Sequence, residues 1–398
     1  LKIISVDSEI TIVGAGIVGS SLACLLSKQG IKVTLIDRGS PLSIPKSSKL
    51  PDRTLALNLS SIDLFKELNI WNELNKQSTP FTRMFVWDSK GSSPLEFLAE
   101  EIKKKELGYV ISNNTILKSL NKYIQDSPEI TLRQQTELSG INVNEKEVSI
   151  SFLGGEKINS ELIIGADGIN STLRKKAKIK TRTWSYDQRA FVAELKTEKF
   201  HDYTAWQIFT PKGPIALLPF DLMEGSNISL VWSAEIDYAE KLQKLSKKEF
   251  VKELEEKTEQ ILGKIDLKTE IRSFPLNQLH AKNYFSERIA LVGDSAHSFH
   301  PLAGQGLNIG LSDVTSLSDV LIKARRRGVD IGSKRTLKDY ERSRKIPNLT
   351  MTAMMELFKD GFATSDPWVK LARNFAFNVT TKSSTLKKRV IKEAAGIT

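Results

Sequence analysis

Two short stretches of this chain hold residue types at a spacing that could bind a cofactor. In the first, Gly14, Gly16 and Gly19 follow the apolar run at residues 10–13 and precede an apolar stretch with helical spacing. Glycines in such a turn let the backbone approach a pyrophosphate, and the start of a helix offers free N–H groups. Asp37 ends the next apolar run, where its carboxylate can accept hydrogen bonds from ribose hydroxyls. Together these features predict a dinucleotide-binding βαβ unit.

The second stretch lies late in the chain, at residues 288–314. A β-branched run opens it and predicts a buried strand, and Asp294 follows the end of that strand. A proline and several glycines then exclude regular structure until a helical pattern begins near Leu307. A carboxylate at a strand end can bind ribityl or ribose hydroxyls, and N–H groups at a helix start can hold a ring that becomes anionic on reduction. An ordinary strand–loop–helix crossover has the same shape, so this stretch by itself leaves both interpretations open.

A third stretch, at residues 162–178, combines an apolar strand, a turn with two glycines and a basic helix. This arrangement can bind a phosphate at the start of the helix. A basic crossover helix without a ligand is the alternative.

The composition of the chain narrows its class. Its 398 residues predict two or three domains, and 40% hydrophobic and 26% charged residues are typical of a soluble protein. The net charge of +11 is spread along the chain without a zinc-finger or RNA-binding pattern, so we expect no nucleic-acid partner. The single cysteine, Cys24, excludes an internal disulfide, and we expect it to be a buried structural thiol. No spacing suggests a metal site.

Membrane and targeting signals are weak in this sequence. No stretch approaches the roughly 18 uninterrupted apolar residues of a membrane span, and no secretory signal pattern is present. The chain begins at Leu1 and not at methionine, so we expect that residues precede it in the natural protein.

Several elements connect the three stretches. Hairpins are predicted at residues 81–97 and 147–156, and Ser60 or Ser61 is expected to cap a helix. Residues 182–235 alternate and are rich in aromatic residues, which predicts an antiparallel sheet. We leave open whether its tryptophans form the core of the sheet or the wall of a pocket. Pro347 is expected to interrupt a late helix.

The order of these elements predicts an α/β fold with a discontinuous, Rossmann-like cofactor-binding domain, an inserted antiparallel β-sheet domain that binds the substrate, and a helical C-terminus. We expect the cofactor domain at residues 1–80, 105–180 and 277–345, the substrate domain at residues 81–104 and 181–276, and the helical region at residues 346–398.

Three motifs in this order resemble the para-hydroxybenzoate hydroxylase class of flavoprotein monooxygenases. They are GAGIVG with Asp37, GADGINSTLR at residues 165–174, and GDSAHSFHPLAGQGLNIGLSDV at residues 293–314. The segments HPLAGQGLNIGLSDV, WSYDQRAFVAELKTEKFHDYTAWQIFTPKGPIALLP and YERSRKIPNLTMTAMMELF are similar to the ubiquinone-biosynthesis hydroxylases within that class. The resemblance covers essentially the whole chain.

The resemblance implies a set of FAD contacts. Gly14, Gly16, Gly19 and Asp37 would hold the adenosine half, Arg53 would lie near the pyrophosphate, and Asp294 would bind the ribityl chain. The pyrimidine edge of the flavin would lie against Gly304, Gln305, Gly306, Leu307 and Asn308. Asp167 and Arg174 would serve both FAD and NAD(P)H, and Pro301 would lie beside the ring. Ser295 stands where many members carry alanine, which is a small departure.

The implied activity is hydroxylation of a polyprenylated phenol of ubiquinone biosynthesis by FAD, dioxygen and NADPH or NADH, through a flavin C4a-hydroperoxide. His300 is a candidate proton relay, although most histidines are structural. The alternatives are a monooxygenase of another aromatic substrate and a non-catalytic flavoprotein subunit of a quinone-biosynthesis complex. We expect a bacterial protein of the cytoplasm that associates with the surface of the inner membrane or with other ubiquinone-biosynthesis proteins. Whether it forms a homo-oligomer is left open.

The last segment, residues 382–395, has the pattern of a short basic amphipathic helix. Its cations are Lys382, Lys387, Lys388, Arg389 and Lys392, and its apolar residues include Leu386, Val390 and Ile391. A polyprenylated phenol is nearly insoluble, so the enzyme must take it from a bilayer or from a partner. We predict that this segment, distant from the flavin site, associates with a membrane or a complex in a salt-sensitive way. A solvated helix is the alternative.

Overall fold

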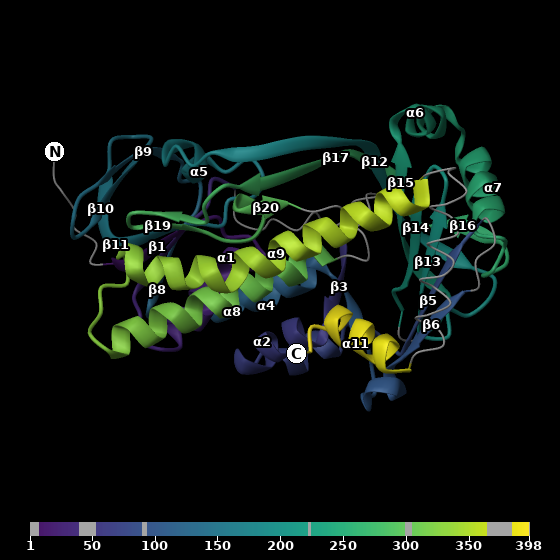
Figure 1. The fold of residues 1–398 in the computed structure, drawn as a ribbon, viewed down its shortest axis with the longest axis horizontal. Helices are drawn as coiled ribbons and strands as arrows, with labels where there is room; N and C mark the ends of the chain where they lie inside the picture. Colours follow the sequence, from purple (N-terminus) through teal and green to yellow (C-terminus); the bar gives the residue numbers. More distant parts are fainter. Residues whose placement is uncertain are drawn as a thin grey trace.

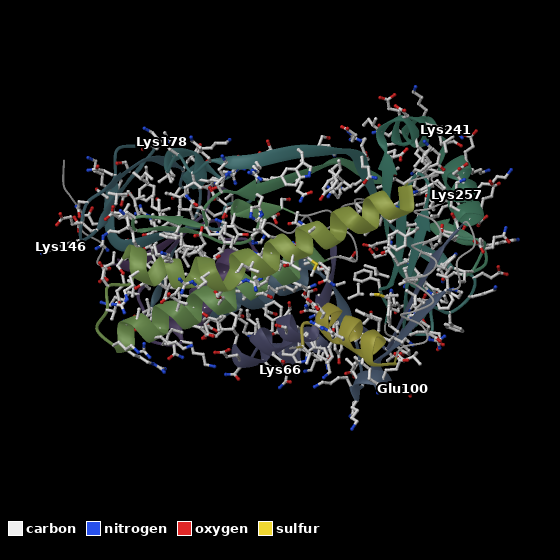
Figure 2. All side chains as sticks on the ribbon, in the orientation of Figure 1. Lys66, Glu100, Lys146, Lys178, Lys241 and Lys257 are labelled. Atoms are coloured by element: carbon white, nitrogen blue, oxygen red, sulfur yellow. The ribbon has the colours of Figure 1, made fainter. Side chains whose placement is uncertain are left out.

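The structure is a computed structural model that describes residues 8–39, 53–89, 94–221, 224–298, 305–363 and 384–397. Two large sheets lie toward opposite ends of an elongated molecule, and the long helices run along its length (Figure 1). The labelled lysines occur at both ends, so positive charge is distributed over the molecule (Figure 2).

The first sheet contains the nucleotide-binding pattern. Its strands in the described residues are β1 (Ser8–Val13), β2 (Val33–Ile36), β8 (Ile130–Arg133), β9 (Leu138–Val143), β10 (Val148–Phe152), β11 (Lys157–Gly165), β18 (Phe285–Ser286) and β19 (Ile289–Leu291). The strands β19, β11, β1, β2 and β8 are neighbours in that order and pair in parallel. The predicted second hairpin is confirmed as the antiparallel pair β10–β11.

Long helices cover this sheet because its strands are apolar on both faces, as parallel strands must be. They are α1 (Ile17–Ser27), α4 (Asn113–Asp126), α8 (Gln305–Arg326) and α9 (Lys334–Ala363). The helix α1 is buried along almost all of its length, and Cys24 within it is fully buried. Burial raises the pKa of this thiol to about 12, which fits a structural residue.

The second sheet is mostly antiparallel. Its strands in the described part of the chain are β5 (Arg83–Asp88), β6 (Leu95–Leu98), β12 (Thr181–Thr197), β13 (Thr204–Thr210), β14 (Gly213–Pro219), β15 (Asn227–Glu235), β16 (Ile265–Leu267), β17 (Arg272–Ala281) and β20 (His297–Ser298). The predicted hairpin β5–β6 is confirmed, and β5 joins the sheet by pairing in parallel with β13. The helices α6 (Ile236–Lys244) and α7 (Lys247–Lys257) bury Phe250 and Leu254 against Trp232 and its neighbours.

A small third sheet completes the described fold. It consists of β3 (Thr54–Asn58), β7 (Gly108–Ser112) and β4 (Ser78–Phe81). The remaining helical elements are α2 (Leu59–Glu67), α3 (Trp71–Asn75), α5 (Thr172–Lys176), α11 (Ser384–Ala394) and the 3₁₀ turns η1 (Ala99–Ile102) and η2 (Gly293–Ser295).

Two local predictions were wrong. The helix α2 is capped by the Asn58 side chain, which accepts a hydrogen bond from the backbone N–H of Ser61, so the cap precedes the predicted serines. Pro347 lies inside α9 and does not end it. Arg344 and Asn348, on either side of this proline, both bind Asp313 of α8, and this packing maintains the helix despite the missing N–H donor.

Candidate flavin and substrate site

The sheet register brings the three predicted cofactor stretches to one edge. Val13 at the end of β1 pairs with Gly165 at the end of β11, and Gly165 pairs with Leu291 at the end of β19. The loops that follow parallel strands at their carboxyl ends therefore lie side by side. Ligands of open α/β sheets bind in this position.

The glycine turn after β1 is shaped for a close approach of the backbone to a ligand. Gly14 has a φ of +108°, and a Cβ added there would lie 2.4 Å from the Ala166 carbonyl oxygen. A Cβ at Gly19 would lie 1.9 Å from the Gly14 carbonyl oxygen, whereas one at Gly16 would meet nothing within 4 Å. Packing therefore requires glycine at positions 14 and 19, whereas Gly16 faces open space. Gly16 therefore occupies the position at which a phosphate could contact the start of α1.

Asp37 holds this turn and the end of β2 together. Its carboxylate accepts hydrogen bonds from the backbone N–H groups of Ala15 at 2.7 Å and Gly39 at 2.6 Å. The side chain is half-buried, so it also has a solvent-facing side. A carboxylate has about four lone-pair sites, which leaves acceptor capacity for the hydroxyls of a ribose.

Asp294 lies at the same edge of the sheet, just after β19. The residue is exposed to solvent, yet desolvation by the surrounding protein raises the pKa of its carboxyl, and the charge of Arg53 opposes this effect. The structure therefore brings together Asp294 and Arg53, which are distant in the sequence.

The loop that carries Asp294 is anchored by residues that the sequence did not identify as functional. The Ser295 hydroxyl donates to the Gly165 carbonyl at 2.5 Å, which ties the loop to β11. The Gly293 N–H donates to the Asp313 carboxylate at 3.0 Å, which ties the loop to α8. Asp313 belongs to the conspicuous late motif, so its position gave a signal, but nothing in its spacing specified a partner.

Asp313 is the centre of a buried polar network. It is fully buried and accepts hydrogen bonds from Arg344 at 2.8 Å and Asn348 at 3.3 Å, and it pairs with His297 Nε2 at 2.5 Å. Burial raises the pKa of this carboxyl, but the combined effect of His297 and Arg344 is larger and lowers it to about 2. Asp313 is therefore charged at any physiological pH.

The stretch after β11 uses its charged residues for internal contacts. One Asp167 oxygen accepts hydrogen bonds from the N–H groups of Thr172 at 2.7 Å and Leu173 at 3.2 Å, at the start of α5. The Arg174 guanidinium is buried and donates to the Ser295 carbonyl at 2.8 Å and to the Ile169 carbonyl at 2.6 Å. These contacts connect α5 to the loop of Asp294. A role of Arg174 toward NAD(P)H stays a prediction.

The start of α8 follows the predicted flavin loop. Gln305, Gly306 and Leu307 are partly exposed there, and a Cβ added to Gly306 would meet nothing within 4 Å. The Asn308 side chain is buried, accepts a hydrogen bond from the Asn58 N–H at 3.0 Å, and donates to the Ala56 carbonyl at 2.8 Å. Asn308 therefore connects α8 to the small third sheet.

An apolar cavity lies beside the start of α8. Its volume is about 70 Å³, several times the roughly 15 Å³ that one water molecule needs. Its lining residues are Ala56, Leu57, Asn58, Phe81, Met84, Phe97, Leu107, Ala205, Trp206, Gln207, Leu218, Gln305, Asn308, Ile391 and Ala395. Trp206 is part of this wall, whereas Trp232 is fully buried in the core of the second sheet. The tryptophans of this sheet therefore include one in a pocket wall and one in the sheet core, the two roles that the sequence left open.

Comparisons with known proteins agree with this geometry. The family model described as FAD binding domain matches residues 7–352. The chain is 34% identical to 3-demethoxyubiquinol 3-hydroxylase of Escherichia coli, covering 98% of this chain and 99% of that protein. It is 33% identical to ubiquinone hydroxylase UbiL of Rhodospirillum rubrum, with 98% and 90% covered. The chain belongs to the ubiquinone-biosynthesis hydroxylase family.

Members of this family are FAD-dependent monooxygenases, and this chain is one of them. Its fold agrees, since the crystal structure of p-nitrophenol 4-monooxygenase from Pseudomonas putida superimposes with a TM-score of 0.79 at 18% identity, covering 98% of each chain. The predicted fold class is thereby confirmed.

The residues of the site fit FAD. The space at Gly16 and Gly306 leaves room for a ligand at the starts of α1 and α8, and the exposed Asp294 offers a carboxyl group to ligand hydroxyls. The residue-by-residue assignment of the FAD contacts stays a prediction.

The structure corrects the predicted position of the C-terminal helix. We expected α11 to lie away from the flavin site, but Ile391 is 2% exposed and lines the cavity. Lys387, expected to face a membrane, pairs with Glu101. The error has a physical cause, because an amphipathic pattern shows that a helix buries one face but not what that face contacts.

Some predicted site residues cannot be placed. His300, Pro301 and Gly304 lie outside the described residues. Within the described ranges, no cluster of three or more histidine, cysteine or acidic residues could hold a metal ion. None of the helices in those ranges is long and apolar enough to cross a membrane.

Proposed function

We propose that this FAD-dependent monooxygenase hydroxylates the ring of a polyprenylated phenol of ubiquinone biosynthesis, using dioxygen and NADPH or NADH. The observation that carries the proposal is the shared position of Gln305 and Asn308. Both residues belong to the start of α8, where the flavin motif ends, and both line the apolar cavity. A ring in this cavity therefore lies next to the proposed flavin position.

The relatives support the choice of substrate. The Escherichia coli relative is a 3-demethoxyubiquinol 3-hydroxylase by name, and the Rhodospirillum rubrum relative is a ubiquinone hydroxylase. The cavity suits such a ring because its lining is mostly apolar, with few polar groups.

The residues of this chain would bind and orient the ring and exclude water. Phe81, Phe97 and Leu218 supply apolar contacts that exclude water from the reacting atoms. Gln207 donates one hydrogen bond to the Ile215 carbonyl at 3.3 Å, and its amide oxygen could accept a hydrogen bond from a phenol hydroxyl. Bound FAD supplies the redox chemistry between NAD(P)H and dioxygen.

The proposal is tested with purified protein. We expect a yellow protein with non-covalent FAD, slow NAD(P)H oxidation without substrate, and faster oxidation with a short-tailed methoxyphenol, accompanied by one hydroxylated product per NAD(P)H. A protein that binds FAD but shows neither phenol-stimulated oxidation nor product would refute the enzymatic function and support the alternative of a non-catalytic flavoprotein subunit.

We also propose that the enzyme docks on an anionic membrane surface through cations near the cavity. Lys388, Arg389 and Lys392 of α11 are exposed, and so are Lys103, Lys104 and Lys105 after η1. The two groups are neighbours, since Lys387 of α11 pairs with Glu101 of η1. Figure 2 shows the labelled Glu100 close to α11. A lipid-embedded phenol could then enter the protein near the bilayer surface.

A further inference from the structure

The wall of the substrate cavity includes residues outside the FAD-binding domain. The family model ends its match at residue 352, whereas Ile391 and Ala395 line the cavity. Both residues are 2% exposed and pack in one apolar cluster with Phe81, Leu107 and Leu218. The family domain therefore leaves part of the cavity to be closed by α11.

The helix α11 is held in this position at both ends. Near its start, Lys387 forms an ion pair with Glu101 in which the two side chains are 16% and 24% exposed. Just after its end, the Ala395 carbonyl accepts a hydrogen bond from the Leu59 N–H at 3.1 Å. Gly396 then turns tightly, with a φ of +71° and space for a Cβ blocked by Asn58 and Ser60.

The same contacts connect α11 to the flavin side of the cavity. The Asn58 N–H donates to the side chain of Asn308, and a Cβ on Gly396 would lie 2.8 Å from the Asn58 side-chain nitrogen. A single residue, Asn58, thus joins the end of α11 to the start of α8. Residues of both α8 and α11 line the cavity, so a ring inside it lies next to both helices.

We propose that α11 forms part of the substrate site, and that Ile391 and Ala395 determine which ring substituents the cavity accepts. The ligand class is a substituted phenol with an apolar tail, so this inference rests on the proposed function. The physical basis is packing, because one methylene group in an apolar pocket changes selectivity by roughly 10- to 200-fold.

The test measures binding of a soluble, short-tailed methoxyphenol to the FAD-loaded protein by titration calorimetry. Ala395→Phe fills the cavity, and we expect at least a tenfold higher Kd for the phenol with FAD affinity within twofold of the wild type. Ile391→Ala enlarges the cavity, and we expect a shift of about tenfold in relative affinity toward a phenol with one additional ring methyl group. Glu393→Phe, on the exposed side of α11, is the matched control and should bind as the wild type does.

Limited trypsin digestion at Lys388 and Arg389 shows whether α11 stays docked in each variant. If Ala395→Phe releases α11, the inference is tested by the relative affinity of Ile391→Ala for the two phenols instead. Wild-type affinity in a docked Ala395→Phe variant, or an unchanged preference in Ile391→Ala, would overturn the inference. Failure of the wild-type, FAD-loaded protein to bind any phenol would instead contradict the proposed function, so the two failures are distinguishable.

Discussion

Individual residues of the cofactor edge divide into two groups. Asp294 and Gly16 face open space, whereas Asp313, Ser295 and Arg174 bind other parts of the protein. The second group keeps the loop of Asp294 in place by contacts to β11, α5 and α8. Substitutions in the two groups should therefore have different effects.

Asp294→Ala should weaken FAD binding by roughly 1–3 kcal/mol, because the variant loses a charged acceptor for ligand hydroxyls. The unfolding free energy should not fall, since desolvation in the folded protein raises the pKa of the Asp294 carboxyl and its charge therefore does not stabilise the fold. Fluorescence titration of the apoprotein with FAD measures the effect. The control is Asp319→Ala, on the exposed face of α8. Equal FAD affinity in the wild type and Asp294→Ala would remove Asp294 from the site.

His280 should make the stability of the protein depend on pH. Burial, together with the charges of His297, Lys345 and Arg182, lowers the pKa of this imidazole to about 4. The charge of Asp313 has the opposite effect on this pKa. The pKa of histidine in an unfolded chain is about 6.5. Between these values the unfolded chain binds more protons, so the unfolding free energy rises with pH from about 4 to about 6.5.

His280→Gln should therefore reduce the difference in unfolding free energy between pH 4 and pH 7 by on the order of 2–3 kcal/mol. Urea unfolding at a series of pH values measures it. Lys282→Gln, at an exposed position nearby, is the control and should retain the wild-type dependence. A His280→Gln variant with the wild-type slope would show that other groups cause the acid sensitivity.

At the scale of elements, α5 and α11 connect parts of the chain that are distant in sequence. Through Arg174, α5 binds the loop of Asp294, and through Lys387 and Ala395, α11 binds η1 and the start of α2. Each helix is short, so its position depends on these contacts more than on its own helical stability.

Arg174→Ala should lower FAD affinity about tenfold, because the Ser295 carbonyl loses a charged donor and the loop becomes less ordered. FAD titration measures this, and Lys175→Ala, exposed on the same helix, is the control. The rate of flavin reduction at saturating FAD then tests the role toward NAD(P)H, which predicts a higher NAD(P)H requirement in Arg174→Ala. FAD affinity equal to the wild type would exclude the structural role.

Lys387→Gln should reduce the free energy that holds α11 against η1 by about 1 kcal/mol, the contribution of a partly exposed ion pair. We expect several-fold faster trypsin cleavage at Lys388 and a weaker affinity for a soluble phenol. The double variant Lys387→Glu with Glu101→Lys restores opposite charges and should recover both properties. If the double variant behaves like the single one, the ion pair does not hold the helix.

At the scale of the whole molecule, the exposed cations near the cavity predict salt-sensitive membrane binding. Lys388→Glu, Arg389→Glu and Lys392→Glu together should reduce binding to vesicles that contain anionic lipid, at about 1 kcal/mol per cation in low salt. Lys387 is left unchanged because its charge is paired. Vesicle co-sedimentation at low and high salt measures the effect, with Lys146→Glu, at the distant end of the molecule, as control (Figure 2). Undiminished binding by the triple variant would place the membrane contact elsewhere.

The sequence by itself determined the local elements of the cofactor edge. The glycine turn after β1 and the carboxylates at strand ends follow a fixed spacing of strand, turn and helix, so they are visible in the chain. The family motifs also predicted FAD, which the FAD-binding family model supports, and the order of the elements predicted the fold class, which the comparisons confirm.

Only the tertiary structure decided which distant residues meet. The network of Asp313 with Arg344 and His297, and the closure of the cavity by Ile391, join residues from separate elements. An amphipathic helix such as α11 has a pattern that fits a membrane or a protein core equally well, because the hydrophobic effect has no direction and rewards any removal of apolar surface from water. The partner of that surface is set by how the sheets and helices pack, which the sequence pattern of one helix does not contain.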